Sequence, residues 1–371
     1  MKVVDVAIVG GGLAGLYLAY RLQQQGLSYC VVEAKSELGG RIFSPSLDGA
    51  HLSVDLGPTW FWPHQPNMKR LLDDLNVPWF EQYTQGDVLY QMQAGVPVQR
   101  NTGAGAMTSY RVDGGMMCLV NALADKVDSQ SIHTSLPIAN MVKQGDASWV
   151  LSGKKSGENE SIKAVHVVLA APPRVLSQHL NLSQYLPNDL SRQLLATPTW
   201  MAAQAKFVAI YQRPFWREEG LSGDVFSRVG PMVELHDAST GGANGIDSTY
   251  ALFGFVGAPP SVRNQHESGV FEQHCLNQLA DVFGEPARQQ LHYYLKDWAQ
   301  DTWVATEQDK TEAPSHPHIA IGAYKSQLEV LNLSFVGAEY AQSEAGYLEG
   351  ALISAQSAMD LIIERLRTSV Q

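Results

Sequence analysis

Apolar runs of strand length and apolar positions at helical spacing alternate along the first part of the chain. Val3–Val9 is an almost continuous apolar run, typical of a strand buried on both faces. Residues 16–25 repeat apolar positions at helical spacing until Gly26 ends the pattern. A second apolar run, Tyr29–Val32, follows and ends at Glu33. This strand–helix–strand order predicts the first unit of a parallel α/β sheet.

The middle and the end of the chain contain further segments that read as strands, joined by turns and glycine-rich loops. Residues 86–99 (GDVLYQMQAGVPVQ) place two short runs around a turn, which predicts a small hairpin. Residues 236–260 place two further strands around a glycine-rich loop. Residues 164–171 form a continuous apolar run that ends at a diproline, and residues 331–362 read as a strand, an acidic turn and a long helix. We therefore expect an α/β part and a smaller sheet-plus-helix (α+β) lobe.

Three glycines stand between the first strand and the helix at the GxGxxG spacing. In a dinucleotide-binding fold Gly10 permits the tight turn, Gly12 lets the backbone approach a pyrophosphate, and Gly15 allows close helix–strand packing. The helix N-terminus offers free N–H groups and a positive dipole to phosphates. Glu33 is placed to accept hydrogen bonds from ribose hydroxyls. These residues predict a dinucleotide site and leave NAD and FAD open.

Length and composition narrow the possible partners. The chain has 371 residues, of which 45% are hydrophobic and 17% charged, and its formal net charge is -11. This charge argues against a nucleic acid or an anionic membrane as partner, since both favour a basic face.

Cys30, Cys118 and Cys275 form no CxxC pair, so we expect reduced thiols, a cytoplasmic location and no metal site. No apolar stretch approaches the roughly 20 residues of a membrane span, and the N-terminal run reads as a strand rather than a signal peptide.

The segment after Glu33 distinguishes FAD from NAD as the expected cofactor. Gly39-Gly40-Arg41 resembles the second fingerprint of the glutathione-reductase-like FAD fold. More narrowly, EAKSELGGRI followed by VDLGPTWFWP resembles the flavin-containing monoamine oxidase and polyamine oxidase family, and the resemblance covers almost the whole chain. The resemblance implies that FAD is the cofactor.

The resemblance also implies a division into two domains. A Rossmann-type FAD-binding domain is expected from residues 1–77, 110–195 and 299–371. The substrate-binding domain is expected from residues 78–109 and 196–298. Its first segment is too short for the helical insertion that commonly roofs the site in this family, which implies a more open cavity or one covered by a partner.

Roles in cofactor binding follow from the same resemblance. Arg41 is expected to offset phosphate charge, Lys35 matches the basic position beside the adenosine ribose, and Ile138 lies against the adenine; a solvated surface lysine is the alternative for Lys35. Glu339 matches the acid near the ribityl-pyrophosphate region, and the Leu348 amide faces the pyrimidine edge of the flavin. The other cofactor positions implied by the family pattern are Leu13, Ala14, Ala34, Gly39, Gly40, Gly57, Pro58, Thr59, Trp60, Trp298, Gly337, Gly346 and Tyr347.

Two residues are assigned to catalysis. AKFVAIYQRPFW resembles the family strand ending in Pro-Phe-Trp, with Lys206 at the position of the lysine that holds a water against flavin N5. A lysine in an apolar strand is costly to bury without a polar task, and the alternative is a strand-end side chain that reaches solvent. Tyr347 matches one of the two aromatic side chains that enclose the substrate above the flavin.

The chain departs from the family pattern after Trp298. Aligned without gaps, the second aromatic position carries Gln308, and Glu307 stands where some members have the cysteine that bonds to FAD. The resemblance therefore implies non-covalent FAD and an incomplete aromatic cage. Trp303 or Trp60 could fill the gap, with core or lobe packing as the alternative for both.

The implied function is oxidation of an amine C–N bond. A neutral amine passes hydride to flavin N5, water hydrolyses the imine, and dioxygen is reduced to hydrogen peroxide. The expected partners are a small-molecule amine and dioxygen, and a homodimer remains open. Three alternatives remain: a phytoene-desaturase-like or protoporphyrinogen-oxidase-like flavoenzyme, a catalytically silent flavin-binding accessory protein, and an amino-acid oxidase in which Arg100 or Arg111 holds the carboxylate.

Overall fold

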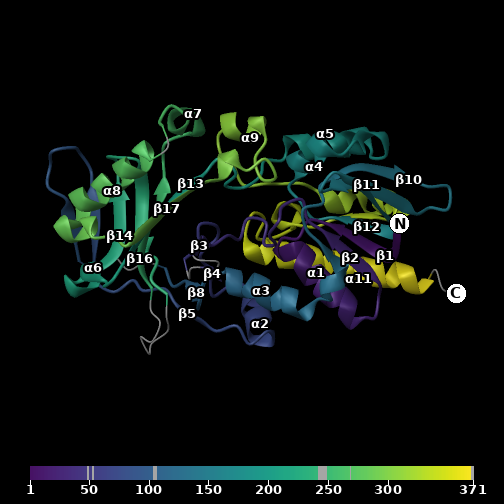
Figure 1. The fold of residues 1–371 in the computed structure, drawn as a ribbon, viewed down its shortest axis with the longest axis horizontal. Helices are drawn as coiled ribbons and strands as arrows, with labels where there is room; N and C mark the ends of the chain where they lie inside the picture. Colours follow the sequence, from purple (N-terminus) through teal and green to yellow (C-terminus); the bar gives the residue numbers. More distant parts are fainter. Residues whose placement is uncertain (48–49, 52–53, 103–106, 241–248, 268, 369–371) are drawn as a thin grey trace.

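Two seven-stranded sheets form two lobes that lie end to end (Figure 1). The computed structural model describes residues 1–47, 50–51, 54–102, 107–240, 249–267 and 269–368. Both chain termini lie in the lobe built on the first sheet, at the end away from the second sheet. Among the described residues, no helix has the length and apolar character needed to cross a membrane.

The first sheet has the strand order β10-β11-β12-β1-β2-β9, with β18 added beside β12. Its strands β1, β2, β9, β12 and β18 pair in parallel, whereas β10 and β11 pair antiparallel on one side. The first strand–helix–strand unit is thus confirmed. The strand bounds are β1 Lys2–Val9, β2 Tyr29–Val32, β9 Ile132–His133, β10 Ile138–Lys143, β11 Trp149–Lys155, β12 Glu158–Leu169 and β18 Leu333–Phe335.

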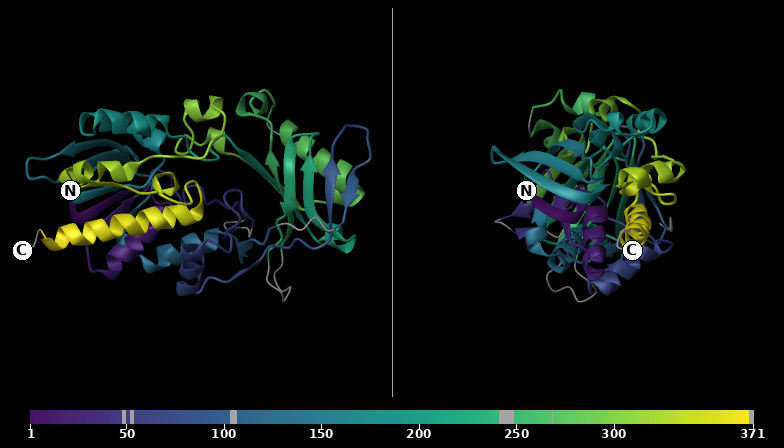
Figure 2. Two further views of the ribbon diagram at one scale, coloured as in Figure 1. Left: turned by 180° about the vertical axis from the view of Figure 1, so that it is seen from behind. Right: turned by 90° about the vertical axis from the view of Figure 1, so that its right-hand side faces the viewer.

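Helices cover both faces of this sheet, so alternate residues of β1 are buried on opposite sides. Val6 and Ile8 pack with helices on one face, and Ala7 packs with helices on the other. Figure 2 shows α11 running along this lobe from the junction with the second lobe to the C-terminus. The first face is covered by α1 Leu13–Gln24, α2 Pro66–Asp74, α3 Met117–Lys126 and α11 Leu348–Thr368, and the second by α4 Pro173–His179, α5 Asn188–Ala196 and α10 Lys325–Leu331.

The first helix begins earlier than its apolar spacing predicts. Gly12 is the last extended residue, with φ -79° and ψ -176°, and the helix starts at Leu13 instead of Leu16. Leu13 and Ala14 are buried, so the glycine-rich turn leads directly into a packed first turn. The turn and the helix N-terminus are therefore one continuous feature.

The second sheet has the order β17-β13-β16-β15-β14-β6-β7. One face packs on α8 Val270–Phe283 through Phe207, Leu235 and Leu279. The opposite face packs against Val54 and Leu56 from the first lobe. The hairpin predicted in residues 86–99 forms further along the chain, because β6 Asp87–Gln91 pairs antiparallel with β7 Gln99–Asn101, whose first residue is the last one predicted. The other strands are β13 Ala205–Tyr211, β14 Leu221–Ser227, β15 Met232–Asp237, β16 Tyr250–Val256 and β17 His292–Asp297.

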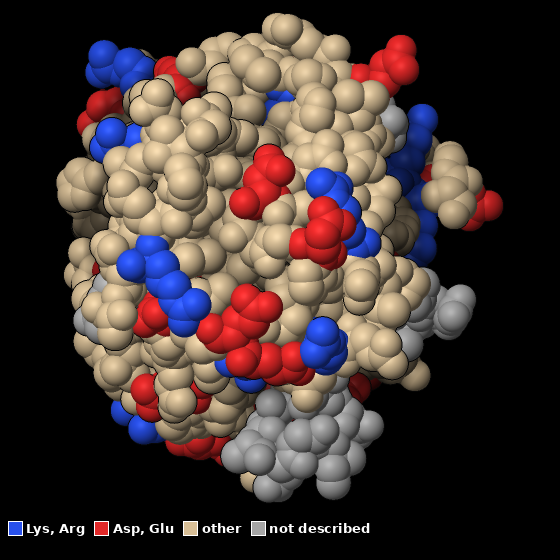
Figure 3. All heavy atoms as spheres, turned by 90° about the vertical axis from the view of Figure 1, so that its left-hand side faces the viewer, with Lys and Arg blue, Asp and Glu red and all other residues tan. Residues whose placement is uncertain are grey.

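The predicted glycine-rich connection between β15 and β16 lies largely outside the described residues. On the end of the second lobe, acidic and basic side chains are interspersed among other residues (Figure 3). Short elements complete the chain: β3 Ser46–Leu47, β4 Ala50–His51, β5 Trp79–Glu81, β8 Tyr110–Val112, α6 Phe215–Glu218, α7 Pro260–Arg263, α9 Glu307–Thr311 and the 3-10 turns Ser129–Ser131, Leu182–Gln184, Glu285–Arg288, Trp298–Gln300, Ile321–Tyr324 and Ala338–Tyr340.

Candidate active site

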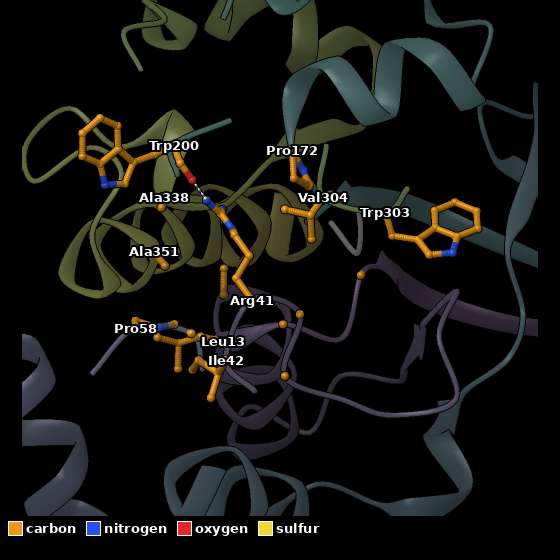
Figure 4. Close-up of a pocket in the computed structure, with 18 of the residues that line it drawn as sticks. Leu13, Arg41, Ile42, Pro58, Pro172, Trp200, Trp303, Val304, Ala338 and Ala351 are labelled. Atoms are coloured by element: carbon orange, nitrogen blue, oxygen red, sulfur yellow. Dashed lines mark hydrogen bonds between the residues drawn. The ribbon is translucent and has the colours of Figure 1, made fainter. Parts of the chain in front are cut away.

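A cavity of about 600 Å³ is lined by residues of both lobes (Figure 4). Almost all of the residues singled out from the sequence reach its wall: Gly10, Gly12, Leu13, Ala14, Glu33, Ala34, Lys35, Gly39, Gly40, Arg41, Gly57, Pro58, Thr59, Trp60, Ile138, Lys206, Trp298, Gly337, Glu339, Gly346, Tyr347 and Leu348. Gly15 does not reach the wall. A Cβ on Gly15 would lie 2.0 Å from the Gly10 carbonyl oxygen, so this glycine lets the helix pack against the turn.

The glycine-rich turn is held in place by Glu33. Its Oε2 accepts a hydrogen bond from the Gly11 N–H at 2.7 Å, and its Oε1 accepts one from the Lys35 N–H at 2.9 Å. The side chain is buried and still reaches the cavity wall. Because each carboxylate oxygen has two lone pairs, acceptor capacity remains for a ligand hydroxyl.

Two glycine segments lie side by side at this end of the cavity. The Gly39 N–H donates to the Gly11 carbonyl at 2.9 Å, and a Cβ on Gly40 would lie 3.3 Å from the Cα of Gly12. Gly39 and Gly40 have φ values of +112° and +64°, a region that side chains rarely adopt. Helix α1 has no side-chain cap and no acidic residue in its first turn, so its N-terminal N–H groups are left for an anion.

Arg41 pairs with a buried acid from the far end of the chain. Its two terminal nitrogens donate to Glu339 at 2.7 and 2.8 Å, and Glu339 is 1% exposed. Nη1 also lies 3.4 Å from the Trp200 carbonyl oxygen, the contact drawn in Figure 4. Arg41 is therefore not a solvated surface arginine, and the pair joins the second glycine segment to the turn before α11.

Lys35 is tied to the cavity wall as well. Its ammonium donates to the Gly40 carbonyl at 2.9 Å and to Asp301 at 3.2 Å, and it lies 5.9 Å from the ring centre of Trp298. The solvated-lysine alternative is wrong. The partner Asp301 follows Trp298 in the sequence but was not singled out by sequence reasoning.

Lys206 is buried at the cavity wall, with 2% of the residue exposed. Its ammonium donates to the Gly57 carbonyl at 3.1 Å and to the Thr59 hydroxyl, and it lies 4.0 Å from the ring centre of Phe253. Burial lowers the pKa of Lys206 to about 7, although the nearby Asp55 carboxylate opposes this change. The strand-end alternative, in which the lysine reaches solvent, is therefore wrong.

Tyr347 has aromatic neighbours that sequence reasoning missed. The ring centre of His316 lies 5.5 Å from that of Tyr347, and Trp62 lies at 5.4 Å on a nearly perpendicular plane. His316 also stacks on Trp200 at 3.8 Å. Trp62, Trp200 and Tyr347 line the cavity, so its aromatic wall joins three separate segments, and the exposed His316 packs on this wall from outside the lining. Only the three-dimensional arrangement brings these residues together.

The gapless alignment after Trp298 is wrong about which residue reaches the cavity. Gln308 and Glu307 are exposed on α9, where Gln308 donates to Glu312 at 2.7 Å. Val304 reaches the wall from this segment. Trp303 also lines the cavity, but it packs on His179 and lies across Arg41 from Trp200 (Figure 4).

Trp60 lies on the wall formed by the second lobe. It packs on Phe253 and His236 and donates to Gln82 at 3.1 Å. Trp60 and Trp303 are thus apart from the rings that surround Tyr347. Neither residue completes that aromatic wall.

An acid–histidine–acid row on the second lobe was also missed. Glu234 lines the cavity and accepts a hydrogen bond from His236 Nε2 at 2.9 Å, while His236 Nδ1 lies 2.7 Å from Asp224. Burial lowers the pKa of His236, but its hydrogen bonds to both carboxylates outweigh this effect and leave the pKa raised. The signal in the sequence was VELHD, where Glu234 and His236 occupy alternate strand positions on one face.

Neither arginine proposed for a substrate carboxylate reaches the cavity wall. Arg100 is a partly exposed residue that pairs with Asp87 on the hairpin. Arg111 is 1% exposed, donates to the Ser239 carbonyl at 3.0 Å, and lies 3.8 Å from Asp55. The amino-acid oxidase alternative loses both of its sequence-based supports.

The cavity fits FAD along its length. It offers a helix N-terminus without a side-chain cap, close-packed glycines, a buried acid and two cations at one end. The other end is an apolar and aromatic chamber into which Lys206, Glu234 and Tyr347 face. The described lining contains no cysteine.

Comparisons with known proteins agree with this geometry. A family model described as flavin containing amine oxidoreductase matches residues 79–363, and one described as NAD(P)-binding Rossmann-like domain matches residues 8–75. Putrescine oxidase of Kocuria rosea is 22% identical over 81% of this chain and 83% of its own length. A probable flavin-containing monoamine oxidase A of Dictyostelium discoideum is 21% identical over 98% of both chains.

A solved structure of putrescine oxidase bound to putrescine superposes with a TM-score of 0.79 at 22% identity, covering 98% of this chain and 99% of the other. The similarity of fold therefore extends over both lobes. These matches confirm the predicted fold class, an FAD-binding Rossmann-type domain with a smaller substrate domain.

Proposed function

The chain belongs to the flavin-containing amine oxidoreductase family and is an FAD-dependent amine oxidoreductase, and we propose that its substrate is a small primary diamine. When bound, FAD supplies the two-electron oxidation of the amine C–N bond. The observation that carries the diamine assignment is Glu234, an acid on the wall of a chamber that is mainly apolar and aromatic and that also holds Lys206.

Glu234 is proposed to bind the distal ammonium of the substrate. Its side chain is 41% exposed and is oriented by His236, so an acceptor face is open to the cavity. The pKa of Glu234 is lowered, chiefly by its hydrogen bond to His236, which keeps the carboxylate charged. Putrescine oxidase, to which the chain is similar in sequence and fold, acts on such a diamine by its name, which supports the assignment.

The reacting amine is proposed to lie beside Tyr347, with Trp62 and Trp200 forming the rest of the aromatic wall. This wall excludes water and holds the amine carbon against the flavin. No protein base is required if the reacting nitrogen arrives neutral. Lys206, with Gly57 and Thr59 fixing its ammonium, is proposed to hold a water beside flavin N5.

The cofactor is proposed to lie along the first lobe, bound without a covalent link. Glu33 is assigned to the adenosine ribose, the N-terminus of α1 to the pyrophosphate, and Ile138 to the adenine. Arg41 and Glu339 are assigned to the region between the pyrophosphate and the ribityl chain. The uncapped helix and the absence of cysteine from the described lining support this arrangement.

The overall reaction is proposed to use dioxygen as the electron acceptor. One amine, one dioxygen and one water give one aldehyde, one ammonia and one hydrogen peroxide, so atoms and electrons balance.

Residues 1–77, 110–195 and 299–371 are proposed as the cofactor domain, and residues 78–109 and 196–298 as the substrate domain. The three thiols are unpaired, which supports the proposed cytoplasmic location.

The test is anaerobic mixing of the purified yellow protein with a panel of mono- and diamines, followed by addition of oxygen. We expect flavin bleaching fastest with a short diamine, recovery of the oxidised spectrum with oxygen, and release of peroxide. Acid precipitation should leave FAD in the supernatant. A protein that stays yellow with every amine would contradict amine oxidation, and bleaching by monoamines alone would contradict the diamine assignment.

A further inference from the structure

A closed circuit of contacts joins the loop before α2 to the turn before α11, behind the aromatic wall of the cavity. The loop carries Trp62 and the turn carries Tyr347. The two rings line the cavity and meet with their centres 5.4 Å apart and their planes at 81°. Because the two segments are distant in the sequence, contacts behind the rings must determine how the rings meet.

Gln65 links the Trp62 backbone to the turn before α11. It is 1% exposed, and its Oε1 accepts a hydrogen bond from the Trp62 N–H at 3.2 Å. Its Nε2 donates to Glu344 Oε2 at 2.7 Å. A glutamine amide has one acceptor end and one donor end, so each end of Gln65 has a defined partner.

Glu344 continues the circuit to Tyr347 through its own backbone. Its carbonyl accepts a hydrogen bond from the Tyr347 N–H at 3.1 Å. Its φ is +56°, in the left-handed region that few residues other than glycine adopt. A Cβ on Gly350 would lie 2.2 Å from the same carbonyl oxygen, so this turn packs directly on the first turn of α11. The backbone of Glu344 thus holds Tyr347, and its side chain holds Gln65.

Glu349 anchors the helix that follows Gln65. It is 1% exposed and lies in the first turn of α11. Its Oε1 accepts hydrogen bonds from the Asn67 N–H at 3.0 Å and the Asn67 side-chain amide at 2.6 Å, and its Oε2 accepts one from the Met68 N–H at 2.8 Å. Since α2 begins at Pro66, which has no N–H, Glu349 satisfies the next two N–H groups of that helix.

We propose that Gln65 and Glu344 are a pair of positioning residues that hold Trp62 perpendicular to Tyr347, with Glu349 as the anchor of α2. The inference rests on the proposed function, in which the reacting amine lies beside these rings. Gln65 and Glu344 are outside the described cavity lining, so they act on a substrate only through the two rings. A displacement of about 1 Å at such a wall can slow a reaction by about 10²-fold.

The test reverses the polarity of the contact between Gln65 and Glu344. Gln65→Glu keeps an acceptor for the Trp62 N–H but places two carboxylates against each other. The double variant Gln65→Glu with Glu344→Gln again pairs one donor with one acceptor. Gln93→Glu makes the same chemical change at an exposed residue between β6 and β7 and is the matched control.

Trp62 is observed directly in the resting holoenzyme, with no amine added. The protein is labelled with fluorotryptophan and studied by fluorine NMR. Trp62→Phe identifies the resonance, and Tyr347→Leu shows how strongly it depends on the neighbouring ring. We expect the Trp62 resonance to shift in Gln65→Glu, to return to the wild-type position in the double variant, and to stay in place in Gln93→Glu.

The same proteins are then reduced anaerobically with a short amine. The rate constant of flavin reduction at saturating amine should fall by about tenfold in Gln65→Glu and recover in the double variant. FAD affinity and reoxidation by dioxygen should stay as in the wild type, because neither depends on the two rings. A role in stability alone would lower Tm without moving the Trp62 resonance or the reduction rate constant.

Three results would overturn the proposal: a Trp62 resonance unmoved in Gln65→Glu, a shift that the double variant does not reverse, or a shift without any change in the reduction rate constant. If Gln65→Glu does not fold, Glu344→Ala and Glu344→Gln decide, since only the second keeps an acceptor for Gln65. The resonance should then move more in Glu344→Ala, and equal positions in the two variants would overturn the proposal. If no amine reduces the flavin, the proposed function fails, whereas the NMR experiment still shows whether the pair positions Trp62.

Discussion

The two ends of the cavity are built in different ways. The end around the glycine-rich turn comes mainly from one stretch, residues 9–42, whose parts contact one another through Gly11, Glu33 and Gly39. The chamber at the other end is assembled from segments far apart in the chain, with Trp62, Lys206, Glu234 and Tyr347 on its wall. Local backbone geometry determines the first end, and packing of the two lobes determines the second. Changes at the first end should therefore affect cofactor binding, and changes at the second should affect rates and selectivity.

The largest expected effect is that of a substitution at Lys206, which should slow reoxidation of the flavin and leave FAD binding unchanged. Lys206→Met keeps much of the buried stem and removes the ammonium, so FAD content should stay close to that of the wild type. Reoxidation of the reduced enzyme by dioxygen should slow by about 10²-fold, because a preorganised charge is lost where negative charge develops. Stopped-flow mixing with oxygen measures this step, and anaerobic mixing with amine, the control, should change less. Unchanged reoxidation would contradict the role of Lys206.

The next effect should appear at the other end, in FAD affinity. Glu33→Ala removes a charged acceptor for the ribose, worth about 1.5–3 kcal/mol, which corresponds to roughly 10- to 100-fold in the dissociation constant. It also removes the acceptor that holds the Gly11 and Lys35 N–H groups, so the turn itself should loosen. Titration of the apoprotein with FAD by flavin fluorescence measures the loss.

Glu33→Gln is the matched variant for that measurement. It keeps one oxygen acceptor for the turn and lacks the charge, so its affinity should fall between those of the wild type and Glu33→Ala. Equal affinity in all three proteins would make Glu33 a structural residue only. Steady-state rates at saturating FAD should change little in either variant.

A third effect concerns selectivity. Glu234→Gln should raise KM for a short diamine by about tenfold, because a charge-assisted contact to the distal ammonium is lost. The KM for a monoamine of the same chain length should hardly change. Glu219→Gln, which alters an exposed acid of the same lobe outside the cavity lining, is the control. Equal losses for diamine and monoamine would refute the ammonium subsite.

The contrast between the two ends also explains what the sequence could predict. The strand, glycine turn, helix and Glu33 follow one another within a short stretch, so spacing alone placed them, and the family resemblance supplied the Gly39-Gly40-Arg41 segment. The resemblance also placed Lys206 and Tyr347 on the cavity wall. It failed after Trp298, where a gapless register assigned Gln308 to the second aromatic position, although Gln308 is exposed on α9 and lies outside the cavity lining.

The missed residues depend on tertiary contacts. His316 meets Tyr347 only because an irregular loop folds back over the start of α11, and no periodic pattern marks such a loop. Glu234 became a site residue only because the cavity-facing side of β15 meets the first lobe. Asp301 and Asp55 are short-range neighbours of recognised positions, but their partners Lys35 and Arg111 are distant in sequence.

The smallest expected effect is a pH dependence of stability from His236. Asp224, Glu234 and the rings of Trp60 and Phe253 surround this imidazole, and its pKa in the folded protein is raised. A raised folded-state pKa means that the folded protein binds the proton more tightly than the unfolded chain. The resulting stabilisation is fully present below the unfolded-state pKa of about 6.5 and is lost as pH rises through the folded-state value.

His236→Gln should therefore lower Tm by about 1–2 °C at pH 6, if the stabilisation is about 1 kcal/mol, and by less at pH 9. Lys206 contributes the opposite slope, since its lowered pKa makes the folded state bind fewer protons above pH 7, so stability from that residue rises with pH. That slope is common to both proteins and cancels when their Tm values are subtracted at each pH. The measurement is a series of thermal melts of both holoenzymes at saturating FAD from pH 5.5 to 9.5. A difference in Tm that is constant with pH would assign His236 a packing role only, and a difference that grows with pH would reverse the sign of its pKa shift.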